Sequence, residues 1–243
     1  PTGRMMNDAP LPKPYHDLGG DAGGPVLPDQ PGEAIFAAAW HKRVLGLTVA
    51  GGAMGAWSID ASRFRRESLP KADYQSFTYY EKWLAALTNL YILKGFISRD
   101  EIENAASDAG AQPLQPLQPL CEKALKAPDV AAMLVRGAKA SRPSDAPMRF
   151  DIGQAVITKL APETLYQTPG HTRLPTYAAG KTGKILFQHG HHVLPNSNAH
   201  FLGECPEALY SVEFLARDLW QDHQHGDNDT VIVDCWDSYL DPA

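Results

Sequence analysis

The sequence predicts an α+β protein with a helical N-terminal domain and a small β-barrel in its C-terminal part. Three observations lead to this prediction. Apolar residues recur at helical spacing within residues 33–110. From residue 149 onward the pattern changes to short runs of β-branched and aromatic residues separated by turn residues. Between the two parts, residues 113–119 (PLQPLQP) repeat proline at the spacing of an extended, semi-rigid linker.

The first 32 residues are rich in proline, glycine and aspartate, including two glycine pairs within residues 19–24. This composition excludes a helix or a central strand, because proline lacks the backbone donor that both structures need. Two interpretations of residues 1–32 stay open. The segment is either a disordered tail or an extended arm that becomes ordered on another chain.

Four helices are expected in residues 33–110. The first lies within residues 33–57 and ends at a glycine-rich turn. Ser58 is a typical N-cap residue, and the short helix that it begins carries Arg63 and ends near Pro70.

The third helix is the strongest of these predictions. Residues 78–95 carry aromatic and aliphatic residues along one face, and Gly95 follows as a C-terminal stop. Ser98 and Glu101 have the spacing of a capping box, which predicts the start of a fourth helix.

Residues 111–148 are interpreted as the proline-rich linker and a short helical piece, roughly 120–139, interrupted at Pro128. The barrel domain, residues 149–243, is expected to contain four short strands, in residues 150–158, 182–188, 209–214 and 230–235. Four or five strands in a segment of this length favour a small closed or partly open barrel.

Charge and composition limit the possible function. The net charge of −6 and the pI of about 5.8 argue against a nucleic-acid partner, which usually needs a basic face. No apolar run has the length of a membrane span, and no signal-peptide pattern begins the sequence, so a cytoplasmic location is expected. The three cysteines, Cys121, Cys205 and Cys235, are widely spaced and odd in number, which favours reduced thiols.

No complete catalytic site is visible in this chain. The sequence contains no nucleophile elbow, zinc-protease, phosphate-loop or dinucleotide motif in a supporting context. His189, His191 and His192 cluster without an acidic or cysteine ligand at a recognisable spacing, so we expect a solvent-facing or loop cluster and not a metal site.

Two arginine-bearing segments stand out instead, residues 58–68 (SIDASRFRRES) and 168–177 (TPGHTRLPTY). On a helix Arg63 and Arg66 share a face, and Arg65 points away. A solvated basic face and a structural anchor for a loop are the ordinary interpretations. The functional one is that the planar, permanently charged guanidinium fork of Arg63 or Arg173 holds oxyanions in a fixed geometry.

Together with other motifs in the same order, these segments resemble the β subunit of nitrile hydratase. The further motifs are residues 16–20 (HDLGG), 79–83 (YYEKW), 180–183 (GKTG), 203–210 (GECPEALY) and 234–239 (DCWDSY). The resemblance implies an enzyme that hydrates nitriles to amides at a non-haem Fe(III) or Co(III) centre. That metal is held by a partner α subunit through a C-x-x-C-S-C motif with sulfinic and sulfenic cysteines, and none is expected on this chain. Residues 203–210 and the pair Cys235 and Trp236 look more like cobalt-type relatives.

The resemblance also implies roles for single residues. Arg63 and Arg173 are expected to be catalytic, contacting the oxidised cysteine oxygens across the subunit interface. Tyr79, Trp83 and Ile59 are expected to line an apolar substrate pocket, although plain helix packing also explains the two aromatic residues.

His171 is expected either to support the residues that contact the substrate or the oxidised cysteines, or to have a purely structural role. Ser62 stands where some relatives have an aromatic residue. The implied architecture is an αβ heterodimer that pairs into (αβ)2, with the arm wrapped around the α subunit and a Src-homology-type barrel.

Three alternatives remain at this point. A thiocyanate hydrolase-type subunit belongs to the same superfamily but is a split piece of this architecture. A non-catalytic maturation protein resembles the N-terminal half alone. The segment 180–183 (GKTG) also resembles turns of RNA-binding barrels, which the acidic balance disfavours.

Overall fold

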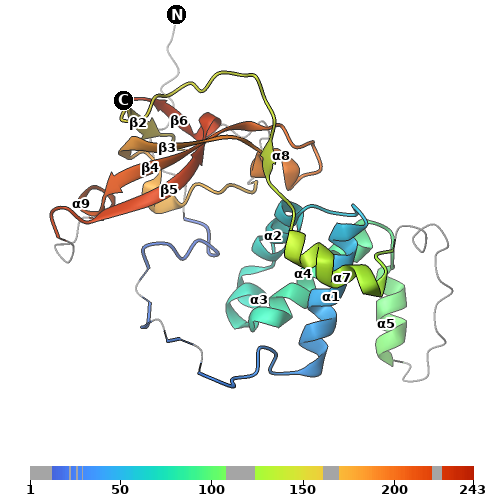
Figure 1. The fold of residues 1–243 in the computed structure, drawn as a ribbon. Coiled ribbons are helices and arrows are strands. Elements are labelled where there is room, and N and C mark those ends of the chain that lie inside the picture. The colour runs from blue at the N-terminus through green and yellow to red at the C-terminus, as the bar shows by residue number, and fades with distance from the viewer. Residues whose placement is uncertain are drawn as a thin grey trace, which may run out of the picture. The chain divides into compact units, whose positions relative to one another are not determined.

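A computed structural model of the chain describes residues 13–21, 23–25, 27–28, 30–107, 124–160, 170–220 and 226–243. The chain divides into two compact units (Figure 1). The helical unit is Pro25–Ala138, and the sheet unit combines Pro1–Gly24 with Lys139–Ala243. Helices and an antiparallel sheet therefore occur together, as the predicted α+β class requires. The boundaries expected after residues 32, 110 and 148 stay predictions.

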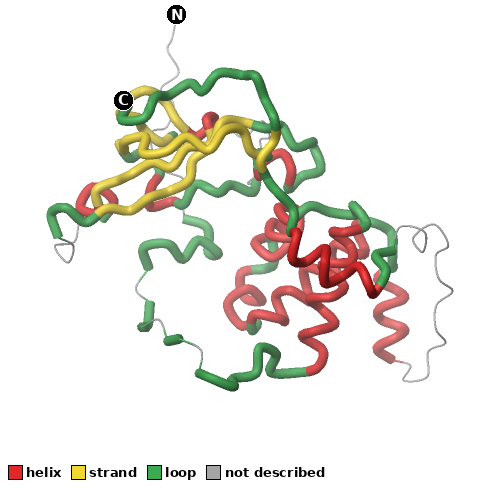
Figure 2. The backbone as a smooth tube through the Cα atoms, in the orientation of Figure 1, coloured by secondary structure: helices red, strands yellow, loops and turns green. Residues whose placement is uncertain are grey.

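The helical unit contains six described helices, drawn in red in Figure 2. They are α1 (Ala39–Ala53), α2 (Ile59–Glu67), α3 (Lys71–Ser76), α4 (Tyr79–Leu93), α5 (Arg99–Ser107) and α7 (Ala127–Arg136). Helix α4 contacts both α1 and α2. The buried core between them consists of Val44, Trp57, Ala61, Leu87 and Leu90.

The predicted helix starts are confirmed. The Ser58 hydroxyl accepts a hydrogen bond from the Ala61 amide at 3.1 Å, which caps α2. At α5 the backbone amide of Ser98 donates to Glu101 at 2.7 Å, as in a capping box. Gly95 adopts a left-handed φ of 68° directly after α4, a conformation that favours glycine at a helix end.

Two expectations about prolines were incomplete or wrong. Pro128 does not interrupt a helix but lies in the first turn of α7, where its missing N–H costs no hydrogen bond. Pro70 ends the segment after α2 as expected, yet it also immediately precedes the short helix α3, which the sequence did not predict. Residues 113–119 lie outside the described part of the chain.

The sheet unit contains six described strands, all paired antiparallel and drawn in yellow in Figure 2. They are β1 (Ser141–Arg142), β2 (Ala155–Thr158), β3 (Thr182–His192), β4 (Glu207–Leu215), β5 (Thr230–Trp236) and β6 (Leu240–Pro242). The order is β5-β4-β3-β2-β6, and β1 pairs with β3. Within the described residues the sheet is open at β5 and β6, so a closed barrel is not seen, and the Src-homology type stays a prediction.

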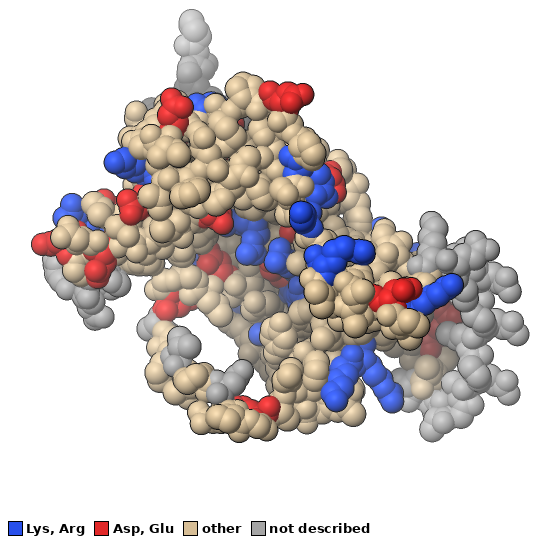
Figure 3. Space-filling model, viewed as in Figure 1, with Lys and Arg blue, Asp and Glu red and all other residues tan. Residues whose placement is uncertain are grey.

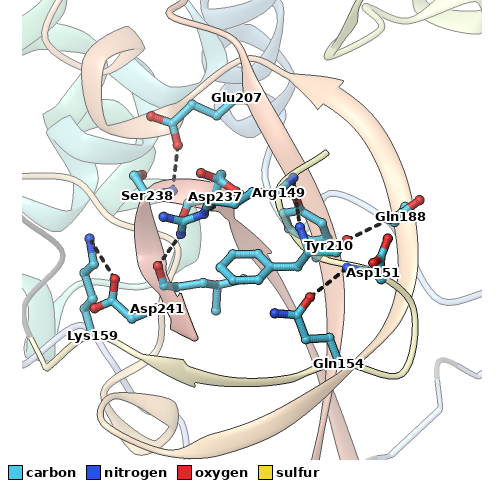
Figure 4. A network of polar contacts seen from close by, with 12 residues as sticks. Arg149, Asp151, Gln154, Lys159, Gln188, Glu207, Tyr210, Asp237, Ser238 and Asp241 are labelled. Carbon is cyan, nitrogen blue, oxygen red and sulfur yellow. Dashed lines mark hydrogen bonds and ion pairs between the residues drawn. The ribbon is translucent and has the colours of Figure 1, made fainter. Parts of the chain in front are cut away.

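The core of the sheet unit is built from one face of β3, β4 and β5 together with the short 3-10 helices η1 (Thr176–Ala178) and η2 (Asp237–Tyr239). A polar network around Tyr210 joins distant segments of this unit (Figure 4). The Tyr210 hydroxyl accepts from the Arg149 amide at 2.8 Å and donates to Asp237 at 3.3 Å. The Arg149 guanidinium in turn donates to the Asp237 carbonyl at 2.9 Å.

The histidine cluster is not in a loop, because all three residues belong to β3. His191 is buried, and the Nε2 atom of His189 lies 2.7 Å from the Ser211 hydroxyl. Gly190, with φ of 76°, sits where the register of β3 shifts against β4. The expectation of a solvent-facing or loop cluster was therefore wrong for His191.

Of the cysteines, Cys235 is buried and Cys205 is exposed, and both are free thiols. Cys121 lies outside the described residues. None of the described helices combines the length and the apolar character needed to cross a membrane.

Candidate functional site

Helix α2 presents Ile59, Arg63 and Arg66 on one face, because these positions are four and three residues apart. The Nη1 atom of Arg63 lies 3.3 Å from Oδ1 of Asp60, whose side chain is buried. The Arg63 side chain keeps 38% of its surface exposed. One buried carboxylate thus orients a guanidinium that stays partly exposed to solvent.

Arg66 lies on the same face of α2, although the sequence predicted no functional role for it. Its Cζ atom lies 4.2 Å from the centroid of the Trp83 ring, which joins α2 to α4. Burial lowers the pKa of Arg66, and nearby Arg63 lowers it further, whereas Tyr79 raises it. The shared helical face of Arg63 and Arg66 was a signal in the sequence, but the aromatic partner on α4 depends on how the two helices pack.

Tyr79 and Trp83 stand one turn apart on α4, with ring centroids 5.6 Å from each other. Tyr79 is 64% exposed, and Ile59 on α2 is 62% exposed. Trp83 is half-buried and packs against the core of the helical unit. Packing within the helical unit therefore explains why Trp83 is partly buried. It does not explain Tyr79 and Ile59, which are large side chains left exposed on the same pair of helices.

Arg173 belongs to the loop that precedes η1 in the sheet unit. Its side chain is exposed, while its neighbours His171 and Leu174 are buried. Its backbone amide donates to the Tyr239 hydroxyl at 3.3 Å, and that hydroxyl donates to Asn196. Burial raises the pKa of Tyr239 to about 12, so the phenol stays a neutral donor at physiological pH.

The predicted site residues therefore fall into two groups. Ile59, Arg63, Tyr79 and Trp83 come together on α2 and α4 of the helical unit. Arg173 and the buried His171 lie in the sheet unit, and Thr168 and Pro169 of the same motif lie outside the described residues.

The described side chains do not form a metal-binding site. In the part of the chain that the structure describes, no three His, Cys, Asp or Glu side chains gather so that they could hold a metal ion. Figure 3 shows Lys and Arg as well as Asp and Glu on the surfaces of both units. The net charge of −6 disfavours the RNA-binding alternative.

Comparison with known proteins decides the family. The family model described as nitrile hydratase beta subunit, N-terminal, matches residues 13–130, and the one described as nitrile hydratase beta subunit, C-terminal, matches residues 139–242. The chain belongs to the nitrile hydratase β-subunit family. The second match begins at residue 139, where the chain passes from the helical unit into the sheet unit.

Relatives within the nitrile hydratase β-subunit family match over nearly the whole chain. The low-molecular weight cobalt-containing nitrile hydratase subunit beta of Rhodococcus rhodochrous is 32% identical, covering 94% of this chain and 98% of its own length. The nitrile hydratase subunit beta of Pseudomonas putida is 33% identical with the same coverage. The cobalt-containing subunit beta of Pseudonocardia thermophila is 32% identical, covering 93% and 94%.

Among solved structures, the recombinant apo-enzyme of thiocyanate hydrolase from Thiobacillus thioparus is 29% identical. It covers 40% of this chain and 78% of its own, with a TM-score of 0.34. The family assignment rests on the two family models and on the nitrile hydratase relatives, each of which matches over at least 93% of the chain.

Proposed function

We propose that this chain is the β subunit of a nitrile hydratase, a hydro-lyase that adds water to a nitrile and forms an amide. The observation that carries the proposal is the match of two consecutive β-subunit domains over residues 13–242. Activity then requires an α subunit that holds Co(III) or Fe(III), in an αβ heterodimer that pairs into (αβ)2 in the cytoplasm. The names of two relatives favour cobalt.

In this proposal Arg63 and Arg173 donate charge-assisted hydrogen bonds to the oxidised cysteine oxygens of the α subunit. Sulfenate is a reactive intermediate oxidation state of cysteine, and the guanidinium of a fixed arginine would hold its oxygen in place by hydrogen bonds. Two features support this role. Arg63 is already oriented by the buried Asp60, and the exposed Arg173 projects from a backbone anchored at Tyr239. The metal, when bound, supplies a Lewis acid.

The substrate pocket of the proposal is lined by Ile59, Tyr79 and Trp83. Two large apolar surfaces and one hydroxyl suit a small, weakly polar nitrile. The exposure of Ile59 and Tyr79 in the chain alone supports a surface that a partner and a substrate would cover. His171, buried two residues before Arg173, would support the loop from behind.

The division into an arm (residues 1–32), a helical domain (33–110), a linker with a short helix (111–148) and a Src-homology-type barrel (149–243) belongs to the same proposal. The arm would wrap around the α subunit over the part of residues 1–32 that does not pack on this chain. Segment 13–21 already contacts the sheet unit.

The first test is a native pull-down of the chain followed by mass spectrometry of what co-purifies. A stoichiometric second chain with oxidised C-x-x-C-S-C cysteines is expected. A folded chain that purifies alone would contradict the subunit assignment.

The second test compares Arg63→Lys and Arg173→Lys complexes with the wild type in nitrile hydration. We expect kcat to fall about 100-fold to 1,000-fold, as for loss of an oxyanion donor, because lysine cannot reproduce the fork. Arg99→Lys, on the exposed start of α5, is the matched control. Near wild-type activity of both site variants would overturn their catalytic role.

A further inference from the structure

The segment 13–21 at the start of the described chain packs on the sheet unit. It lies against Tyr177 and Trp220, whose rings are 5.2 Å apart. A Cβ atom on Gly19 would come within 2.6 Å of the Tyr177 ring, and one on Gly20 within 2.6 Å of the Trp220 indole nitrogen. The two glycines therefore permit a close approach that any side chain would prevent, and Gly20 also has a left-handed φ of 77°.

Asp17 makes a polar contact between this segment and the start of η1. Its Oδ2 atom accepts a hydrogen bond from the Thr176 amide at 2.7 Å, and its Oδ1 atom accepts from the Gly19 amide at 3.1 Å. Thr176 is the first residue of η1, and Pro175 before it offers no side-chain cap. The carboxylate thus satisfies an amide at the start of η1 that has no partner within the turn.

The electrostatic environment of Asp17 favours its charged form. Burial raises the pKa of Asp17, but the hydrogen bonds from Thr176 and Gly19 and the charge of Lys13 outweigh it, so the pKa is lowered overall. Both oxygens accept from backbone amides, which is a role that an amide side chain cannot fill, since one of its two ends is a donor.

Arg173 stands three residues before Thr176. Three contacts fix the backbone around Arg173. The Arg173 amide donates to the Tyr239 hydroxyl, the side chain of Leu174 is buried in the core, and the Thr176 amide donates to Asp17. The first two anchors come from the sheet unit proper, and the third comes from a segment 159 positions away in the sequence. Removal of the third anchor would free the turn on one side of Arg173 while the core beneath it stays intact.

We propose that Asp17 is a positioning residue for Arg173: its carboxylate fixes the turn after Arg173 and thereby the direction in which the guanidinium leaves the sheet unit. This inference rests on the proposed catalytic role of Arg173. It assigns a function to the HDLGG motif, residues 16–20, within the chain itself, in addition to any contact with a partner.

The test is a double-mutant cycle in the complex of this chain with its co-produced α subunit: wild type, Asp17→Asn, Arg173→Lys and the double variant. We expect Asp17→Asn to lower kcat about tenfold, because a small misplacement of a catalytic group lowers rate strongly, with little change in KM. In the Arg173→Lys background the same substitution is expected to change kcat less than about twofold, since the two residues act together. Asp21→Asn is the matched control, because Asp21 lies in the same segment and pairs with Lys13.

A second readout is independent of activity. Hydrogen exchange in peptides covering residues 170–180 is expected to accelerate in Asp17→Asn, while exchange in α4 stays unchanged. If Asp17→Asn does not assemble, Asp17→Glu, which keeps the charge and adds one methylene, replaces it in the same cycle and is expected to lower kcat less than tenfold.

The outcomes are distinguishable. An Arg173→Lys variant with wild-type kcat would overturn the catalytic role of Arg173 and this inference with it. A large Arg173→Lys effect beside an unaffected Asp17→Asn variant would overturn the inference alone. Equal losses from Asp17→Asn in both backgrounds would assign Asp17 a general structural role, which also overturns it.

Discussion

The guanidinium of Arg66 lies over the indole ring of Trp83 at 4.2 Å from the ring centroid, and this contact joins α2 to α4. Replacement by Arg66→Gln is expected to lower the free energy of unfolding by about 0.5–2 kcal/mol, the range for a partly desolvated cation–π contact. Urea titration followed by tryptophan fluorescence measures the change. Arg99→Gln removes the same charge at an exposed position of α5, and an equal loss there would attribute the effect to charge alone.

Replacing glycine by alanine in α1 is predicted to have opposite effects on stability at Gly51 and at Gly46. A Cβ atom on Gly51 would lie 2.0 Å from the buried Trp57 ring, whereas none of the described atoms lies within 4 Å of a Cβ on Gly46. Gly51→Ala is expected to destabilise by about 1–3 kcal/mol or more through overpacking. Gly46→Ala is expected to stabilise by about 0.5–1 kcal/mol through helix propensity. Thermal unfolding distinguishes them, and a shift of the same sign in both would contradict the packing argument.

The Tyr210 hydroxyl accepts from the Arg149 and Phe150 amides inside the sheet unit. Tyr210→Phe leaves these amides without that acceptor, so a loss of about 1–3 kcal/mol in unfolding free energy is expected. The same change at the exposed Tyr79 serves as the control and is expected to have little effect on stability. The idea would be refuted by a Tyr210→Phe variant as stable in urea as wild type.

The contribution of Asp17 is expected to depend on pH. Its pKa is lower in the folded chain than in the unfolded chain, so its stabilisation is fully present above the unfolded value of about 4 and disappears as pH falls through the lower folded value. The stability difference between wild type and Asp17→Asn should therefore be constant near neutral pH and shrink in acid. Urea midpoints of both proteins, measured between about pH 7 and pH 3, test this, with Asp21→Asn as control. A difference that grew in acid would reverse the assigned sign.

Burial raises the pKa of the Cys235 thiol to about 12, and the charge of Asp234 adds to this effect. The thiolate is the reactive form, so Cys235 is expected to resist iodoacetamide at pH 8 in the folded chain. The exposed Cys205 is expected to react. Peptide mass spectrometry after labelling with and without denaturant measures both. Labelling of Cys235 at the rate of Cys205 without denaturant would contradict the buried position.

Local signals were enough to predict most of the regular structure. The caps at Ser58 and Ser98 and the stop at Gly95 act within a few residues of the helix ends, so their outcome did not depend on tertiary packing. The strands β3, β4 and β5 are long enough for alternation to show. By contrast, β1 and β6 have two and three residues and exist only through pairing with β3 and β2.

The candidate site was predictable only in part, because some of its contacts join residues that are distant in the sequence. The family motifs drew attention to Arg63 and Arg173, but Arg66 and Asp17 depend on partners distant in sequence. The ring beneath Arg66 belongs to another helix, and the amide bound by Asp17 is 159 residues away. No periodicity marks such contacts, which follow from the way α2 packs on α4 and segment 13–21 packs on the sheet unit.

The sheet unit is assembled from both ends of the sequence, which imposes an order on its synthesis. At about 5–20 residues per second, a ribosome delivers Thr176 roughly 8–30 seconds after Asp17. All of Pro25–Ala138 is made within that interval, so the helical unit has its complete sequence while segment 13–21 still lacks its docking surface. The anchor on the Arg173 turn therefore cannot form before the whole helical unit has been synthesised, and a chain truncated before Thr176 would expose HDLGG to proteases.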